Sequence, residues 1–280
     1  MAEYNDGVLT LRESDKSVSR KVFLMSDVHF DSVFCNRDLL KKHLDAALQE
    51  NAWIVLGGDW FDAMQGRFDP RRSMDELRQE YRRDDYYDFV VSDSASFLAS
   101  YAKQIVMICR GNHELAVLKN ANTDLTDRLV YALAAHGGQA VAGGWKGWIR
   151  FILSASEHNG SVFLYFAHSA GDGSAPVTRG VIATNRQSVY LPDADIIWNA
   201  HNHHAYIVPL ARERLTRKGV RYTDIAWHVR SPGYKREWDS DSGFAAQRGF
   251  GPRPLGCAEV TIKHNPHGRP SVTANLLMEA

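Results

Sequence analysis

Carboxylate, amide and imidazole side chains occur in six short segments spread over the 280-residue chain. The segments are Asp27-Val28-His29, Gly58-Asp59-Trp60-Phe61-Asp62, Gly111-Asn112-His113-Glu114, His168, His201 and His203. Such oxygen and nitrogen ligands suit Mn²⁺, Fe and Zn²⁺, and none of the segments offers a thiolate. Because the first three segments directly follow apolar runs, we expect the ligands at one edge of a sheet, where they would bind metal ions.

The elements that position these segments begin with three buried strands, predicted from the apolar runs 22–25, 53–56 and 104–109. Residues 36–51 have helical periodicity, with Asn36 as the N-cap. One side of this helix would carry Leu39, Leu40, His43, Leu44, Ala47 and Leu48. A further helix is predicted over 122–136, capped by Asn122 or Thr123 and ended by Gly137-Gly138. Alternating strands and helices indicate a sheet with parallel strand pairs and covering helices.

The second half of the chain is predicted to be rich in strands. Two of them, 148–154 and 162–166, flank Asn159-Gly160, a dipeptide typical of hairpin turns because both residues tolerate positive φ. Further strands are expected at 196–199, 206–210, 222–229, 257–262 and 272–277. The segment 231–256 is rich in Gly, Pro, Arg and aromatic residues, and we expect a long loop there.

Two charged or aromatic segments allow more than one interpretation. The spacing of residues 71–101 predicts helical structure, which could form a lid or contact phosphate groups. Its acidic and basic residues are interleaved, however, and this balance favours a plain solvated helix. Its aromatic residues Tyr86, Tyr87 and Phe89 could stack on bases, although such clusters more often pack in a core. The loop at 231–256 could select the substrate or could be a surface excursion.

Composition limits the class of protein. The formal net charge is zero and the pI is about 7.2, so a wide basic surface for duplex DNA is not indicated, whereas a local groove is compatible with this balance. The three cysteines match no CxxC pattern, which predicts reduced thiols in a cytoplasmic protein. No apolar run is long enough to span a membrane. Residues 1–20 are expected to be a polar N-terminal extension. Residues 21–280 are expected to form one domain, with a helical insertion at about 64–103.

The order of the segments, Asp-x-His, Gly-Asp-x-x-Asp, Gly-Asn-His-Glu, His and His-x-His, resembles that of the calcineurin-like metallophosphoesterases from residue 21 to about 210. The resemblance implies an α/β (α+β) fold, namely a four-layer αββα sandwich of two mixed β-sheets flanked by helices. It also implies two divalent metal ions, with Mn²⁺ preferred and Fe, Zn²⁺, Ni²⁺ or Co²⁺ as alternatives. Phosphate esters would be hydrolysed by a metal-bound hydroxide.

The same resemblance implies a set of metal ligands. Asp59 would bridge the two ions. The first ion would also be bound by Asp27, His29 and His203, and the second by Asn112, His168 and His201. The adjacent histidines at 203 and 204 leave the last ligand ambiguous by one position, and His203 is preferred because of its spacing from His201.

Two further residues are assigned to proton transfer by the resemblance. His113 would contact the phosphate and protonate the leaving group. The carboxylate of Asp62 would pair with His113, raise the pKa of its imidazole and fix its orientation. The chain departs from the family pattern at Ala200, where Gly is usual, and at Ala63, where protein phosphatases carry Arg.

The second motif, Gly57-Gly58-Asp59-Trp60-Phe61-Asp62, is closest in form to the nuclease and phosphodiesterase subgroups. We therefore expect phosphodiester hydrolysis, with nucleic acid or a nucleotide as the substrate. A phosphomonoesterase acting on a small molecule or a phosphoprotein is the alternative, and the absence of Arg at Ala63 argues against the phosphoprotein version. A non-catalytic scaffold is the third hypothesis, and the complete ligand set argues against it. No oligomeric state is predicted.

Overall fold

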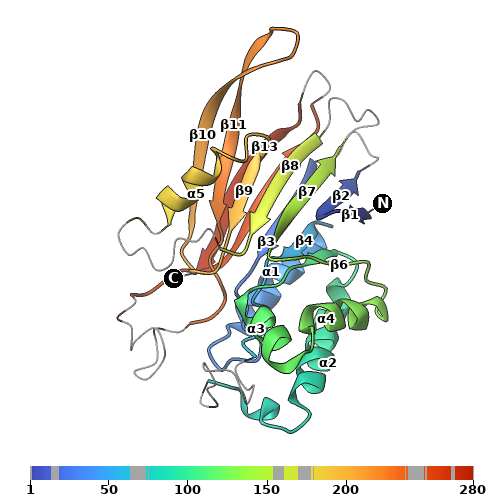
Figure 1. The fold of residues 1–280 in the computed structure, drawn as a ribbon. Coiled ribbons are helices and arrows are strands. Elements are labelled where there is room, and N and C mark those ends of the chain that lie inside the picture. Colours follow the sequence, from blue (N-terminus) through green and yellow to red (C-terminus); the bar gives the residue numbers. More distant parts are fainter. Residues whose placement is uncertain are drawn as a thin grey trace.

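Two β-sheets packed face to face form the centre of the molecule (Figure 1). The computed structural model describes residues 2–13, 19–63, 74, 76–153, 161–169, 178, 180–236, 238, 249, 251–265 and 269–279. One sheet has the strand order β13 (Ser271–Glu279), β12 (Leu255–Lys263), β3 (Ser19–Met25), β4 (Trp53–Leu56), β5 (Ile105–Ile108) and β6 (Val141–Ala142). The other has the order β1 (Ala2–Asn5), β2 (Val8–Arg12), β7 (Lys146–Ile152), β8 (Ser161–Ala167), β9 (Ile196–Asn199), β11 (Arg221–Arg230) and β10 (Tyr206–Leu215).

Helices cover the outer faces of both sheets. The six-stranded sheet carries α1 (Arg37–Gln49), α2 (Tyr86–Leu98), α3 (Asn112–Ala121) and α4 (Leu125–Ala134), which gather below it in Figure 1. Two short 3₁₀ helices, η1 (Gln79–Tyr81) and η2 (Ala99–Tyr101), precede and follow α2. The seven-stranded sheet is covered by α5 (Val181–Gln187). Both sheets contain parallel and antiparallel pairs, so the predicted αββα sandwich of two mixed sheets is confirmed.

Side-chain alternation along β3 explains why the sheets form a middle layer. Val22 and Leu24 pack into the apolar core between the two sheets, whereas Phe23 and Met25 pack into the core under the helices. Successive side chains of a strand point to opposite faces, and a strand buried on both faces therefore reads as a continuous apolar run. β4 and β5 also bury residues in both cores, which is why these three strands could be predicted from short apolar runs.

The strands of the second half lie close to their predicted positions. β7 and β8 pair as an antiparallel hairpin from Lys146↔Ala167 to Ile152↔Ser161, while its predicted Asn159-Gly160 turn lies outside the described residues. Residues 2–12, which the sequence analysis assigns to a polar extension, instead form two strands of the seven-stranded sheet. β2 runs parallel to β7 and buries Leu9 and Leu11.

Three predicted helical features differ from the structure. Leu48 is exposed, because the buried side of α1 carries Leu39, Leu40, His43, Leu44 and Ala47. The α4 N-cap is Asp124, whose carboxylate accepts the backbone N–H groups of Thr126 and Asp127. In the described part of 71–101, an α-helix begins only at Tyr86. Arg78 instead donates from its side chain to the carbonyls of Ser32 and Cys35, which holds the chain before α2 against the loop after β3.

A buried histidine in α1 predicts a specific acid sensitivity. Burial, and then the nearby Lys42, lower the pKa of His43 to about 4, while its Nδ1 lies 3.0 Å from the hydroxyl of Tyr234. The unfolded chain therefore binds more protons than the native one between pH 6.5 and 4, and stability is lost as the pH falls through that range. We expect the parent to lose about 2–3 kcal/mol more than His43→Gln between these pH values in urea titrations. Equal losses in the two proteins would contradict the assignment.

Candidate metal centre

The predicted ligands lie in loops at the carboxyl ends of parallel strands. Asp27 follows β3, Asp59 follows β4 and Asn112 comes shortly after β5, and these three strands are neighbours in one sheet. His168 follows β8, and His201 comes shortly after the adjacent parallel strand β9 of the other sheet. The two sheets contribute to one cluster, since His168 Nε2 lies 3.1 Å from Asp59 Oδ2 and 3.1 Å from Asn112 Oδ1.

Five of the seven predicted metal ligands have backbone φ angles in the left-handed region. They are Asp27 (51°), His29 (50°), Asp59 (51°), His201 (73°) and His203 (55°). Residues other than glycine rarely adopt this conformation, and each such residue costs on the order of 1–3 kcal/mol. Backbone hydrogen bonds impose it here, because the N–H groups of Val28 and His29 both donate to the carbonyl of Asp59. Strain concentrated in one cluster is typical of a functional site.

The described residues contain three compact groups of potential ligand atoms, and the predicted metal ligands make up two of them, whereas the third joins His29 to Asp62 and His113. In the first, Asp27, His29 and His203 offer atoms that all lie within 4.8 Å of one another. In the second, Asp59, His168 and His201 do the same. The alternative ligand His204 belongs to no such group among the described residues.

Two buried atoms in the first group indicate that the cluster suits cations. Within the described part of the chain, Asp27 Oδ1 and His29 Nε2 are buried and have no hydrogen-bond partner. A buried carboxylate oxygen or imidazole nitrogen left in this way costs free energy, and a cation between them would satisfy both. Carboxylate, amide and imidazole ligands are also the donor set that divalent first-row metals bind. The residues therefore fit metal ions.

In this cluster, the charges of the imidazole and carboxylate groups offset the effect of burial on each other's pKa. Burial alone would raise the pKa of Asp59, but His168 and then His113 outweigh it and hold that pKa well below its usual range. Burial alone would lower the pKa of His168, but the charge of Asp59 outweighs it and raises that pKa to about 10. The carboxylates are thus held ionised, which is the form that binds a metal.

The carboxylate of Asp62 is arranged differently from the predicted pairing with His113. His113 Nδ1 contacts the backbone carbonyl of Asp62, and the carboxylate oxygen Oδ1 is 3.8 Å from that nitrogen. Asp62 Oδ1 instead accepts from His29 Nδ1 at 2.8 Å and from Lys235 Nζ at 3.0 Å. The buried carboxylate of Asp31 accepts the N–H groups of Asp62 and Ala63 and so fixes this turn.

Glu114 is a buried residue of the site to which the sequence analysis gave no role. Its carboxylate accepts the backbone N–H groups of Asp59, Phe61 and Gly111 at 2.8–3.0 Å. Burial, and then the charge of Asp59, raise the pKa of Glu114 to about 7. The signal for it was present, because a Glu three residues after a helix N-cap is the capping-box pattern.

Glycine at position 111 allows the loops after β4 and β5 to approach closely. A Cβ atom at Gly111 would lie 2.1 Å from Asp59 Oδ1 and 2.5 Å from the Asp59 backbone nitrogen. Any side chain at this position would therefore displace Asp59. The Gly111-Asn112 step thus positions Asp59 as well as starting α3.

Lys235 is also absent from the predicted site, although it lies in the segment predicted as a loop. Its side chain is almost fully buried, with Nζ 3.0 Å from Asp62 Oδ1 and 3.0 Å from Glu76 Oε2. The charge of Lys235 is the main factor that, against burial, keeps the pKa of Asp62 below its usual range. No sequence motif indicates this contact, because the two residues are 173 positions apart.

The comparisons with known proteins agree with this arrangement. A family model described as calcineurin-like phosphoesterase matches residues 20–245. No protein with a curated description matches the sequence.

Three solved structures also match this chain over most of its length. A predicted phosphoesterase from Streptococcus pneumoniae TIGR4 is 11% identical, with 92% of this chain and 99% of that chain covered and a TM-score of 0.35. Vps29 from Entamoeba histolytica, complexed with Zn²⁺, is 9% identical, with 92% and 98% covered and a TM-score of 0.39. Vps29 from Chaetomium thermophilum is 10% identical, with 91% and 95% covered and a TM-score of 0.35.

Within the described residues, no helix has both the length and the apolar character needed to cross a membrane. The family match extends over most of the chain and contains every residue of the two ligand groups. On that match, the chain belongs to the calcineurin-like phosphoesterase family.

Proposed function

We propose that this protein is a metal-dependent phosphodiesterase whose substrate is a nucleotide or a nucleic acid. The observation that carries the proposal is the pair of buried ligand groups, brought together from the carboxyl ends of both sheets. Membership of the calcineurin-like phosphoesterase family supports hydrolysis of a phosphate ester. The Gly-Asp-Trp-Phe-Asp form of the second motif favours a diester.

The proposed ligands divide between two divalent ions, with Mn²⁺ preferred. Asp27, His29 and His203 would bind the first, and Asn112, His168 and His201 the second, with Asp59 shared. When bound, such ions polarise the phosphate and lower the pKa of water, which makes hydrolysis feasible near neutral pH.

Hydrogen bonds fix which nitrogen each proposed histidine ligand presents. His29 Nδ1 donates to the carboxylate of Asp62 at 2.8 Å, and His168 Nδ1 donates to the carbonyl of Gly57 at 3.0 Å. In the neutral form of each ring, Nε2 is then left with its lone pair for a metal ion. Because the pKa of His168 is raised to about 10, metal binding would release a proton from its Nε2. Partners of this kind set the tautomer and orientation of a metal-binding imidazole.

His113 is suited to protonate the leaving alkoxide. Its Nδ1 donates to the backbone carbonyl of Asp62, since a carbonyl can only accept. A second proton can therefore be held at Nε2, and the side chain is 11% exposed, so a substrate can reach it. The ring is also fixed by an edge contact with His29 at 4.7 Å between centroids. A single positioned acid of this kind contributes about 10²–10⁴-fold to the rate.

An Asp62→Asn variant is expected to bind Mn²⁺ about 10–100-fold more weakly than the parent. The change replaces the charged acceptor of His29 by a neutral one and removes a negative charge from the site. Isothermal titration of the metal-free proteins would measure both dissociation constants. Asp45→Asn, which alters an exposed aspartate on α1, is the matched control. An unchanged dissociation constant in Asp62→Asn would contradict the proposed role.

The proposed activity is tested with bis(p-nitrophenyl) phosphate as a diester and p-nitrophenyl phosphate as a monoester. We expect the Mn²⁺-loaded protein to hydrolyse the diester faster, and the activity to disappear after dialysis against a chelator. Faster monoester turnover would establish the phosphomonoesterase alternative. Absence of turnover, together with identical melting curves with and without Mn²⁺, would establish a scaffold, because a ligand that binds only the folded state must raise its stability.

A further inference from the structure

A two-stranded ribbon projects from the seven-stranded sheet (Figure 1). β10 and β11 pair along their whole length, from Tyr206↔Arg230 to Leu215↔Arg221. β9 pairs only with residues 227–230 of β11, and β10 is the edge strand. The outer half of the ribbon therefore has no hydrogen-bonded neighbouring strand among the described residues. A two-stranded hairpin is at best marginally stable by itself, so the part of the ribbon beyond β9 must be held by other contacts.

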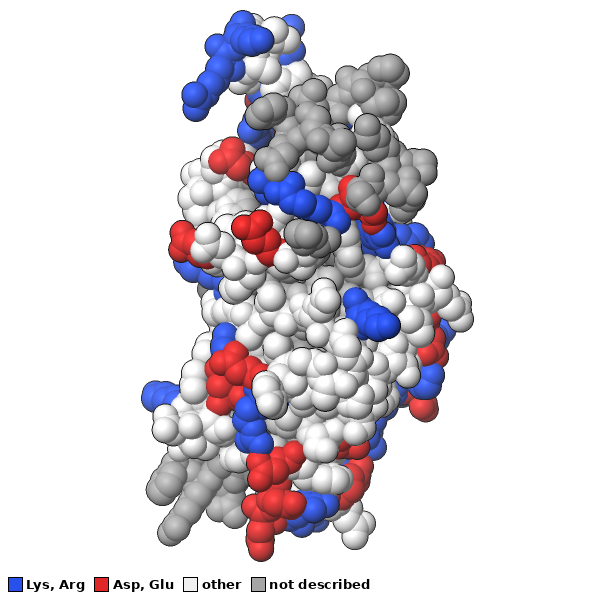
Figure 2. Space-filling view, turned by 90° about the vertical axis from the view of Figure 1, so that its right-hand side faces the viewer, with Lys and Arg blue, Asp and Glu red and all other residues white. Residues whose placement is uncertain are grey.

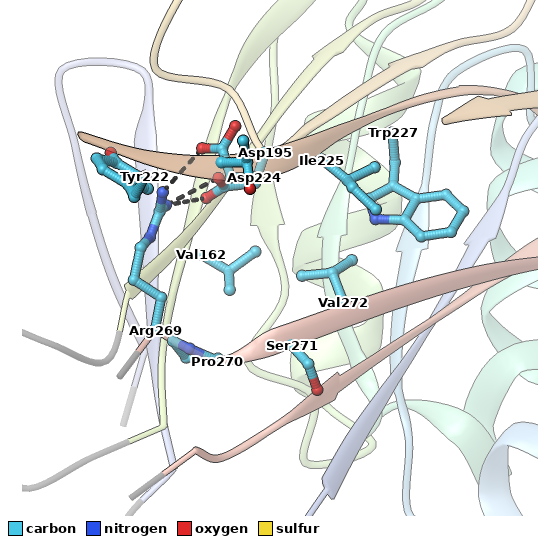
Figure 3. Close-up of a pocket in the computed structure, with 11 residues that line it drawn as sticks. Val162, Asp195, Tyr222, Asp224, Ile225, Trp227, Arg269, Pro270, Ser271 and Val272 are labelled. Atoms are coloured by element: carbon cyan, nitrogen blue, oxygen red, sulfur yellow. Dashed lines mark hydrogen bonds and ion pairs between the residues drawn. The ribbon is translucent and has the colours of Figure 1, made fainter. Parts of the chain in front are cut away.

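Charged side chains supply those contacts within the outer half of the ribbon, below the turn. Arg212 binds the directly opposite Asp224 through two hydrogen bonds of 2.8 and 3.0 Å. Figure 3 shows Arg269 reaching both Asp195 and Asp224 at one end of a cavity of about 410 Å³. Arg214 Nη1 donates to the carbonyl of Pro192 at 2.7 Å. The carboxylates of Asp195 and Asp224 are thus paired with arginine side chains.

The turn at the tip of the ribbon exposes basic side chains. Thr216 N donates to the Val220 carbonyl, and Gly219 has a φ of +78°, so the loop is the three-residue turn Arg217-Lys218-Gly219. Turns of this length require a left-handed third residue, which glycine supplies, and they place the first two residues at the apex. Both cations are exposed, as is Arg221 at the start of β11.

The outer half of the ribbon is positively charged, although the chain as a whole has no net charge. Residues 212–224 contain five cations and two carboxylates, a net charge of +3, whereas the whole chain has a formal charge of zero. Arg221 lies 3.7 Å from Glu213, but both side chains are mostly exposed and such a pair is weak. Figure 2 shows the resulting blue tip at the top of the molecule, where the ribbon of Figure 1 ends.

We propose that this ribbon binds the sugar-phosphate backbone of duplex DNA and guides it toward the metal centre. The inference rests on the proposed phosphodiesterase function and narrows its substrate to a double-stranded polymer. β10 begins three residues after His203, so the ribbon is a direct continuation of the metal-binding loop. Ten residues of β-strand extend about 33 Å. This is close to the length of one turn of duplex, about 34–36 Å. One turn of DNA lying along the ribbon would therefore reach from the tip of the ribbon to the metal ligands.

Charge and shape favour this partner over others. The major groove of B-DNA, about 12 Å wide, admits a two-stranded ribbon, whereas the deep and narrow major groove of A-form RNA does not. The outer half of the ribbon exposes three large apolar residues, Leu215, Val220 and Ile225, and each is next to a charged residue in the sequence. A partner held mainly by apolar contacts would require a larger apolar patch.

The test compares DNA binding with small-substrate turnover in the 280-residue chain. The variant Arg217→Ala/Lys218→Ala/Arg221→Ala removes the three exposed cations, and Lys41→Ala/Lys42→Ala/Lys263→Ala removes three exposed cations on α1 and β12 as the matched control. Fluorescence anisotropy with a labelled 30-base-pair duplex, in a chelator to prevent cleavage, gives the dissociation constant at several salt concentrations. We expect the tip variant to bind at least about tenfold more weakly, with the slope of log K against log salt reduced by about one per cation removed.

Bis(p-nitrophenyl) phosphate turnover separates this inference from the proposed function. The tip variant should keep the turnover of the parent, because the tip lies far from the ligands. Failure of the parent to hydrolyse the diester would refute the phosphodiesterase proposal. Parent turnover combined with no DNA binding, or with an equal salt slope in parent and tip variant, would overturn the ribbon proposal alone. The ribbon proposal would also be overturned if the three substitutions weakened binding to acidic vesicles or to single-stranded DNA but not to the duplex.

Discussion

An Asp59→Asn variant is expected to hydrolyse bis(p-nitrophenyl) phosphate at least about 10³-fold more slowly than the Mn²⁺-loaded parent, a loss of about 4 kcal/mol of transition-state stabilisation. Asp59 Oδ1 accepts the backbone N–H of His113 at 2.9 Å, and an asparagine oxygen can keep this bond. The second carboxylate oxygen, 3.1 Å from His168 Nε2, would become an amide N–H₂ group. An N–H₂ group cannot bind a cation, so the variant loses the ligand shared between the two ions. Because the bond to His113 is kept, the variant should fold normally.

The measurement for Asp59→Asn combines initial rates with melting curves. Asp193→Asn, which alters a side chain that is 81% exposed, is the matched control and should keep the parent rate. Mn²⁺ should raise the melting temperature of the parent and the control but have little effect on Asp59→Asn. Equal turnover in Asp59→Asn and the parent would remove both the bridging assignment and the proposed hydrolytic mechanism.

The strands that carry the first three ligand segments could be predicted because they are buried on both faces. Val22 to Met25 and Trp53 to Leu56 are uninterrupted apolar runs, and a polar ligand follows each run within three residues. α1 could be predicted because Asn36 caps it by accepting the N–H of Leu39 and a continuous apolar side follows. In each case the signal is local: strand, turn and helix chemistry lie within a few residues of one another.

Elements whose stability depends on distant contacts could not be predicted. β2 buries only Leu9 and Leu11, and it becomes a strand by pairing with β7, more than 130 residues away. The charged residues before α2 have helical spacing, yet Arg78 finds better partners in the carbonyls of Ser32 and Cys35. Tertiary hydrogen bonds of this kind override helix propensities of a few tenths of a kcal/mol per residue.

The candidate site could likewise be predicted only in part. Motif order predicted which residues gather, and the two ligand groups contain six of the seven proposed metal ligands. The hydrogen-bond partner of each side chain was harder to predict, because one aspartate at the end of a turn can face several neighbours. The carboxylate of Asp62 hydrogen-bonds to His29 and Lys235, whereas His113 Nδ1 is farther from it, at 3.8 Å. Asp31 holds the backbone N–H of Asp62. Such a choice depends on three segments meeting in space.

A Glu114→Ala variant is expected to lower the free energy of unfolding by about 3–5 kcal/mol, because it leaves three buried N–H donors without an acceptor and each costs about 1–3 kcal/mol. These donors belong to Asp59, Phe61 and Gly111, so the loss also loosens the loops that hold the shared ligand. Guanidinium titrations would measure the change, and the melting temperature should fall by roughly 10 °C. Glu114→Gln keeps one acceptor oxygen and should lose less than half as much. A change below about 1 kcal/mol in Glu114→Ala would show that water or a backbone shift satisfies these donors, and the loops after β4 and β5 would then need another explanation for their close approach.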